Sequence, residues 1–449
     1  MNLLTFLGTA DYKQTTYTLA GQGYTTCYCP AAVAYFCRPE TTLVVVTKDA
    51  RAKHFEPLAD EIASFTQPVA VPIPDGHSEA DLWQIFDALT RQVEAEAELV
   101  VDITNGFRSL PFLSFLAVAF LRLARRVKVE RIYYGAWEAR NQAANESPIF
   151  DLTPFVTLLD WTIATDRFTR FGDASDLAAL LRQGIPPGSQ MSRDLPARAL
   201  GNALKRAATA MEGVSLALRL TRPLETMTAS ANLAATWQQV GALVEQQAPP
   251  FGLLAAAVRQ TYQPLAMAQD PLERANWRLN LQIQLDLVGL YLKRGQVVQA
   301  VTLAREWLVS LLVYAFAGAS LVDYEQGREP VERALNNEVE RRKPNPRALL
   351  ETPYDEALQK LPNARELGQL WNKLTQLRND LAHVGMNLNP KPAEKLARDA
   401  HELYPRLQEV GRLLLANHEG GHEPDRPSPR MKIRATHYAL WTTQYAKGF

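Results

Sequence analysis

The chain has 449 residues, enough for about two to three domains at roughly 150 residues each. Lysine plus arginine and aspartate plus glutamate both total 48, so the formal charge is zero and no global basic surface indicates nucleic-acid binding. The three cysteines, at positions 27, 29 and 37, are too few and too clustered for a disulfide framework or a four-ligand zinc site, and we expect no metal site.

The amino-terminal segment, residues 2–7, predicts a short strand. It is too short for the apolar region of a signal peptide, so we expect a cytoplasmic protein. Gly8 and Thr9 end this strand, and the loop that follows carries Tyr12, which makes it a first candidate ligand loop. A Gly-Gln-Gly turn further along, between two strand-like segments, predicts a β-hairpin.

Strands and helices alternate from there to residue 135. The expected strands are 43–47, 69–73, 99–103 and 129–135, and the expected helices are 50–64, 79–97 and 111–126. This alternation predicts an α/β fold with a parallel, doubly wound sheet and right-handed crossovers. Ligands of such sheets bind beyond the carboxyl ends of the strands.

The segment 99–111, LVVDITNGFRSLP, combines a buried strand, a polar turn and the start of a helix at Pro111. Free backbone N–H groups at the start of a helix favour an anion. Arg108 adds a planar cation suited to phosphate, and Thr104 and Asn105 add short hydrogen-bonding side chains. The sequence therefore predicts an anion site where this turn and the first loop share one edge of the sheet.

From about residue 158 to about residue 416 the chain shows helical periodicity, divided by proline and glycine. The segment 307–319 is apolar on nearly every side, as in a central buried helix or a subunit contact. A basic loop, 340–347, is a candidate RNA contact, although a solvated loop is the favoured interpretation. The role of the tail, 417–449, is not indicated.

A helix expected from about 364 to 384 carries Arg378, Asn379 and His383 near its end. On an ideal helix Arg378 and His383 lie about 140° apart, so one helix does not pair them. Spacing alone favours surface charges and a histidine that caps the helix. The alternative is RNA cleavage across two helices or subunits, in which histidine moves a proton and arginine neutralises charge on the phosphate without a metal.

Together these segments resemble the CARF–HEPN ribonucleases that accompany type III CRISPR systems. The amino-terminal resemblance is carried by LTFLGT, residues 4–9, and above all by DITNGFRSLP, residues 102–111. Arg378, Asn379 and His383 resemble the HEPN motif of arginine, a polar residue, a short spacer and histidine. The resemblance implies a Rossmann-like CARF domain followed by an all-α HEPN domain, and it favours the catalytic interpretation of the second motif.

The resemblance also implies a mechanism. Two chains would form a homodimer in which the CARF domains share one ring of cyclic oligoadenylate, most simply cyclic tetra-adenylate, as an allosteric activator and with no other cofactor. The helical domains would cut single-stranded RNA without metal, by attack of the ribose 2′-hydroxyl. The ring contacts would come from Gly8, Thr9, Thr104, Asn105, Gly106 and Arg108, with Tyr12 and Phe107 added as candidate adenine-stacking residues.

The expected domains are a CARF domain (1–160), a helical linker region (161–270), a HEPN domain (271–416) and the tail (417–449). Two other functions stay open. One is a cyclic-oligoadenylate sensor whose helical half regulates a partner without cutting RNA. The other is a dinucleotide-dependent enzyme on the same type of sheet, which is least favoured because GQGYTT lacks the G-x-G-x-x-G turn.

Overall fold

The structure is a computed structural model that describes residues 1–106, 109–247, 251–316, 319–386 and 388–416. The strands are β1 (Asn2–Phe6), β2 (Thr15–Leu19), β3 (Gln22–Thr26), β4 (Thr41–Val46), β5 (Gln67–Pro72), β6 (Glu98–Asp102), β7 (Lys128–Gly135) and β8 (Glu146–Asp151). The helices among the strands are α1 (Cys29–Cys37), α2 (Lys48–Ala50), α3 (Glu56–Ile62), α4 (Glu79–Arg91) and α5 (Leu110–Ala124).

Beyond the last strand the described chain is helical. The helices are α6 (Thr153–Phe171), α7 (Ser175–Gln183), α8 (Gly188–Met191), α9 (Leu195–Arg219), α10 (Pro223–Gln247), α11 (Phe251–Tyr262), α12 (Trp277–Lys293), α13 (Val297–Phe316), α14 (Glu329–Glu340), α15 (Asp355–Gln359), α16 (Ala364–Ala382) and α17 (Ala393–Ala416). The expected order, an α/β domain and then a helical region, is confirmed.

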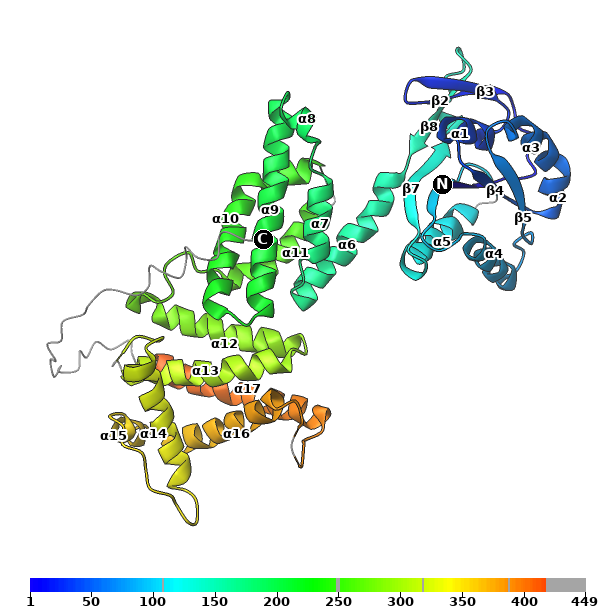
Figure 1. Ribbon diagram of the computed structural model, residues 1–449. Helices are drawn as coiled ribbons and strands as arrows, with labels where there is room; N and C mark the ends of the chain where they lie inside the picture. Colours follow the sequence, from blue (N-terminus) through cyan, green and yellow to red (C-terminus); the bar gives the residue numbers. More distant parts are fainter. Residues whose placement is uncertain (107–108, 248–250, 317–318, 387, 417–449) are drawn as a thin grey trace. The chain divides into compact units, whose positions relative to one another are not determined.

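The described strands form one eight-stranded sheet, in the order β3-β2-β8-β7-β6-β1-β4-β5 (Figure 1). The five strands from β7 to β5 in this order run parallel. After β5 the chain crosses to the other side of β1 and enters β6, so the winding reverses between β1 and β6. A doubly wound sheet binds its ligands at such a reversal.

The sheet is mixed, which differs from the expected parallel sheet. β8 runs antiparallel to β7 and pairs in parallel with β2, and β3 completes the hairpin at the edge. The hydroxyl of Thr15 in β2 bonds to the carbonyl oxygen of Asn145 at 2.8 Å and lies 3.1 Å from the hydroxyl of Ser147. The predicted hairpin therefore joins the sheet through β8, a strand that the sequence did not predict.

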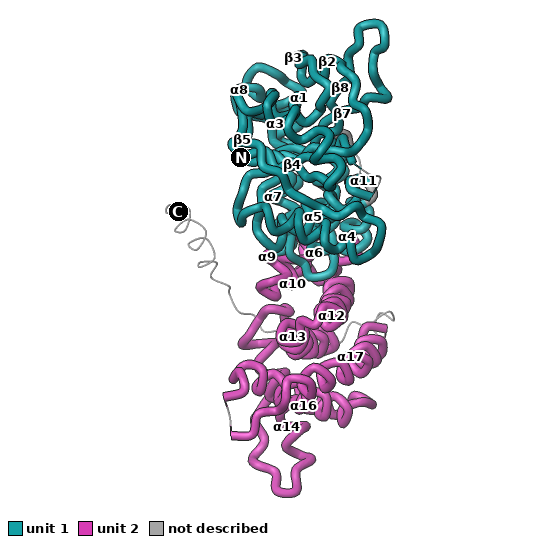
Figure 2. Tube along the Cα trace, turned by 90° about the vertical axis from the view of Figure 1, so that its right-hand side faces the viewer, with its two compact units in different colours: residues 1–215, 235–261 teal, residues 216–234, 262–449 magenta. Residues whose placement is uncertain are grey.

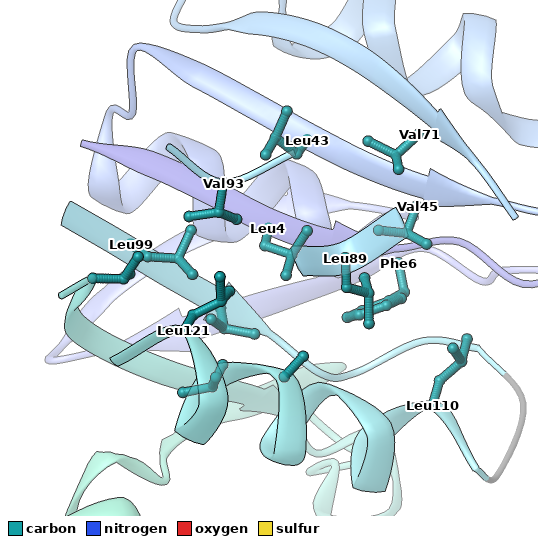
Figure 3. Packing of buried hydrophobic residues seen from close by; sticks show 14 of the residues in the cluster. Leu4, Phe6, Leu43, Val45, Val71, Leu89, Val93, Leu99, Leu110 and Leu121 are labelled. Atoms are coloured by element: carbon teal, nitrogen blue, oxygen red, sulfur yellow. The ribbon is translucent and has the colours of Figure 1, made fainter. Parts of the chain in front are cut away.

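Alternate residues of the strands enter two cores on opposite faces of the sheet. Leu4 and Leu43 pack against α4 and α5 (Figure 3). Their neighbours Leu3 and Val44 pack on the other face, against α1 and α3. Helices therefore cover both faces, as apolar strands buried on both sides require.

The described chain divides into two compact units (Figure 2). Unit 1 comprises residues 1–215 and 235–261, and unit 2 comprises 216–234 and 262–449. The expected domain boundaries at 160 and 270 stay predictions.

Helix α13 is the core helix of unit 2, since every residue from Trp307 to Val313 is buried. This agrees with a central buried helix, one of the two interpretations of segment 307–319, in which residues 317 and 318 lie outside the described residues. By length and composition α13 also meets the test for a membrane span, but 67% of its most apolar stretch is buried inside the protein. Core burial accounts for its apolar character.

Candidate functional site

The loops that follow β1 and β6 meet at the reversal of the sheet. A Cβ atom added to Gly8 would lie 3.6 Å from the backbone nitrogen of Gly106 and 3.6 Å from the Tyr12 hydroxyl. The N–H of Gly8 donates a hydrogen bond to that hydroxyl at 2.7 Å. The structure thus brings together the two candidate loops that the sequence placed far apart.

Asp102, at the end of β6, is hydrogen-bonded both to β1 and to the turn after β6, and so holds the starts of both loops. Its side chain is fully buried. It accepts hydrogen bonds from the Thr5 hydroxyl at 2.7 Å and from the Thr104 N–H at 3.0 Å. Burial raises the pKa of the Asp102 carboxyl, and the bonds from Thr104 and Thr5 oppose that shift. Sequence reasoning missed Thr5 and Asp102, although polar residues inside apolar strands were an available signal.

Thr104 faces inward. Its hydroxyl donates to the Asp102 carboxylate and accepts a hydrogen bond from the N–H of Gly135 at 2.7 Å. The hydroxyl therefore ties the turn after β6 to the end of β7. In this arrangement both the hydroxyl and the backbone N–H of Thr104 position the turn, because Asp102 accepts hydrogen bonds from both.

Tyr12 packs against the side chains of His54 and Tyr28. Its ring centre lies 4.6 Å from that of His54 and 5.5 Å from that of Tyr28. Burial raises the pKa of Tyr12 to about 12. Two residues from another part of the chain also hold this loop, and sequence reasoning missed both. Lys53 donates a hydrogen bond to the carbonyl oxygen of Thr9 at 2.8 Å, and a ring nitrogen of His54 lies 2.8 Å from the carbonyl oxygen of Ala10.

At the end of the second turn Asn105 is half-buried and Gly106 is exposed. The Nδ2 of Asn105 is buried and has no hydrogen-bond partner among the described residues. Gly106 has φ +115°, a conformation that favours glycine, and it is exposed. Phe107 and Arg108 lie outside the described residues. The turn therefore offers an unused N–H donor and a backbone without a side chain beside the start of α5.

The second motif lies at the end of α16. Arg378 is half-buried, Asn379 is exposed, and His383 is the exposed residue that follows the last turn of the helix. Within the described part of unit 2 their side chains form no hydrogen bond or ion pair. These three polar side chains are therefore available to a ligand or to another chain.

The buried face of α16 is anchored one heptad before Arg378. Trp371 donates its ring N–H to Asn336 at 2.8 Å, and the guanidinium of Arg305 lies 4.5 Å from its ring centre. Arg305 is held in turn by Glu332 at 2.9 Å. Residues seven positions apart share a helix face, so the anchored Trp371 also fixes the direction in which Arg378 leaves the helix.

Three cations of the basic loop, 340–347, pair with acidic residues of the same chain. Arg341 pairs with Asp355, Arg342 with Glu338, and Lys343 with Glu340. This agrees with the favoured interpretation of a solvated loop.

No protein-family profile matches this chain. Over 109 residues the chain is 29% identical to a CRISPR-associated protein of Methanocaldococcus jannaschii. The similar segment covers 24% of this chain and 17% of that protein. Over part of its length, the chain is thus distantly similar to a CRISPR-associated protein.

Proposed function

We propose that this protein is a cyclic-oligoadenylate-activated endoribonuclease that cuts single-stranded RNA in a type III CRISPR defence system. The observation that carries the proposal is the meeting of the loop after β1 with the turn after β6, where the Nδ2 of Asn105 has no described partner. The similarity to a CRISPR-associated protein supports the biological setting.

The activator site would use backbone and short side chains. Phosphates of the ring would accept hydrogen bonds from Asn105 and from N–H groups at the start of α5, where the helix dipole favours negative charge. Gly8 and Gly106 keep the two loops free of side chains that would block a close approach. Arg108 is the proposed phosphate-binding cation.

The chemistry would lie in unit 2. His383 would take the proton from a ribose 2′-hydroxyl, whose oxygen then bonds to the adjacent phosphorus. The bond between phosphorus and the 5′-oxygen would break, and the 5′-oxygen would take up a proton and leave as a hydroxyl group. Arg378 would stabilise the negative charge that develops on the phosphate, and Asn379 would help to position it. These groups supply acid–base and electrostatic catalysis from the protein itself, so we propose a metal-independent reaction.

A two-fold-symmetric ring requires two copies of the chain, and α5 offers a surface for the second copy. Three aromatic residues are exposed here: Trp83 by 66%, Phe112 by 64% and Phe120 by 49%. At about 150–250 Å² per aromatic side chain, they leave on the order of 350 Å² of aromatic surface in solvent. Leu116 and Leu123 extend this apolar face along α5. A standard interface buries about 800 Å² per partner, more than half of it apolar. The face is large enough for the core of a homodimer.

The test is cleavage of labelled single-stranded RNA in EDTA, with and without cyclic tetra-adenylate. We expect cleavage only with the ring. His383→Ala and Arg378→Ala should abolish cleavage and leave ring binding unchanged, whereas His401→Ala, at an exposed histidine of α17, should keep both. Ring binding without cleavage by the wild type would favour the non-catalytic sensor instead. Cleavage that is indifferent to the ring would contradict the proposed activation.

A further inference from the structure

Unit 2 contains a cavity of about 380 Å³ that the proposed mechanism does not use. It lies among the turn between α9 and α10, the first half of α12, the middle of α13 and the segment 321–328. Its volume is in the range of small-molecule sites, and such sites occur between the helices of bundles.

One wall of the cavity carries an unused acceptor. Gln284 is only 6% exposed and Asn280 is fully buried. Gln284 donates from Nε2 to the Oδ1 of Asn280 at 2.6 Å, and Asn280 donates to the carbonyl oxygen of Pro271 at 2.8 Å. The Oε1 of Gln284 has no hydrogen-bond partner in the described chain. An unpaired acceptor of a largely buried residue in the cavity lining favours a ligand that brings an N–H donor.

The charged groups of the lining differ in how they are used. Arg328 is fixed by Glu306 at 2.6 Å, by the Ser310 hydroxyl at 2.7 Å and by the carbonyl oxygen of Leu321 at 2.8 Å. Arg222 is exposed, and no described residue pairs with its side chain. Arg222 is therefore the lining cation that no described residue pairs with, and an anion would bind there. The lining also contains the carboxylate of Glu225.

The rest of the lining is largely apolar, with Leu224, Leu303 and Leu321 among its members. A ligand that matches all three features has a flat body, an N–H edge at one end and an anionic group at the other. We propose that the cavity binds one nucleotide, with its base against Gln284 and its phosphate on Arg222. The nucleotide is either free or part of an RNA strand, and the second case rests on the proposed ribonuclease function.

Calorimetric titration of the full chain tests this. The probes are the four ribonucleoside 5′-monophosphates and a single-stranded 2′-O-methyl RNA tetramer, which lacks the attacking hydroxyl. At least one of these probes should bind. Arg222→Ala and Gln284→Leu should each weaken that binding about tenfold, the effect of losing one hydrogen bond to a buried or charged group.

Two matched controls lie outside the cavity lining. Arg219→Ala removes an exposed arginine three residues before Arg222, and Gln282→Leu removes an exposed amide on the same helix as Gln284. Both should bind within about twofold of the wild type. Binding of the tetramer alone identifies an RNA strand as the source, and binding of a monophosphate identifies a free nucleotide.

Absence of binding by all five probes overturns the proposal. An equal loss of probe affinity in the variants and in the controls overturns it as well. Arg222 is a surface residue, so its variant tests the site even where Gln284→Leu lowers stability. The titration involves neither cleavage nor the cyclic ring. A chain that binds a nucleotide and cuts no RNA would therefore refute the proposed ribonuclease while leaving the nucleotide site in place.

Discussion

The Thr5 hydroxyl donates a 2.7 Å hydrogen bond to the buried carboxylate of Asp102, joining β1 to β6 at the end where both candidate loops leave the sheet. The same carboxylate holds the turn after β6 through Thr104. One buried acid therefore sets the relative position of two loops that lie about a hundred residues apart in the sequence.

The buried acid gives the first prediction, a pH dependence of stability. Burial raises the pKa of Asp102, so the folded chain keeps this proton at pH values where the unfolded chain, with a pKa of about 3.9, has lost it. This contribution to stability falls as pH rises from about 4 through the folded pKa. Urea unfolding should show that the wild type loses stability relative to Asp102→Asn as the pH rises above about 4, the unfolded-state pKa. A constant or increasing difference would contradict this.

Thr104→Val gives the second prediction. The substitution removes a hydroxyl that serves both Asp102 and the N–H of Gly135. Asp102 then keeps only its bonds from the Thr5 hydroxyl and the Thr104 N–H, and the Gly135 N–H loses this acceptor. We expect a loss of about 1–3 kcal/mol in the free energy of unfolding. The matched control is Thr9→Val, at an exposed threonine of the other loop, which should change stability by less than about 0.5 kcal/mol. Equal effects would show that the Thr104 hydroxyl does not support the turn.

Gly106→Ala gives the third prediction. Gly106 has φ +115°, and an added Cβ would lie 2.5 Å from the Cδ1 of Leu110, at the start of α5. We expect a loss of about 1–3 kcal/mol in stability and weaker ring binding, because the turn must shift. Gly188→Ala is the control, since no atom lies within 4 Å of the added Cβ. A melting temperature of Gly106→Ala equal to that of this control would refute the strain.

Local pattern was sufficient for much of the fold. Apolar runs such as 99–103 identified the core strands, and helical periodicity identified α16 within about two residues. β8 was not predicted because its sequence, ESPIFD, is short and polar, and it forms only where β2 and β7 supply partners from distant parts of the chain. Pairing at long range is not encoded in a local pattern.

For the candidate site, the sequence indicated the loops but not their supports. Asn105 and Gly106 were expected to face a ligand, and the structure leaves an unused donor and a bare backbone there. Thr104 was grouped with them by position alone. Its inward hydroxyl follows from the buried carboxylate of Asp102 and the N–H of Gly135, which are neighbours only in the folded sheet.

The fourth prediction concerns the apolar face of α5. The double variant Leu116→Glu, Phe120→Glu would place two charges without partners inside the proposed homodimer contact. We expect this variant to sediment as a monomer and the wild type to sediment as a dimer. Ring binding should weaken with it, because each chain would then offer half of the site. The control, Leu195→Glu, changes a leucine of unit 1 that is 78% exposed and lies outside this face, and it should stay dimeric. If the double variant is still a dimer, the contact between the two copies lies elsewhere. If the wild type is a monomer at all concentrations, the proposed homodimer is wrong.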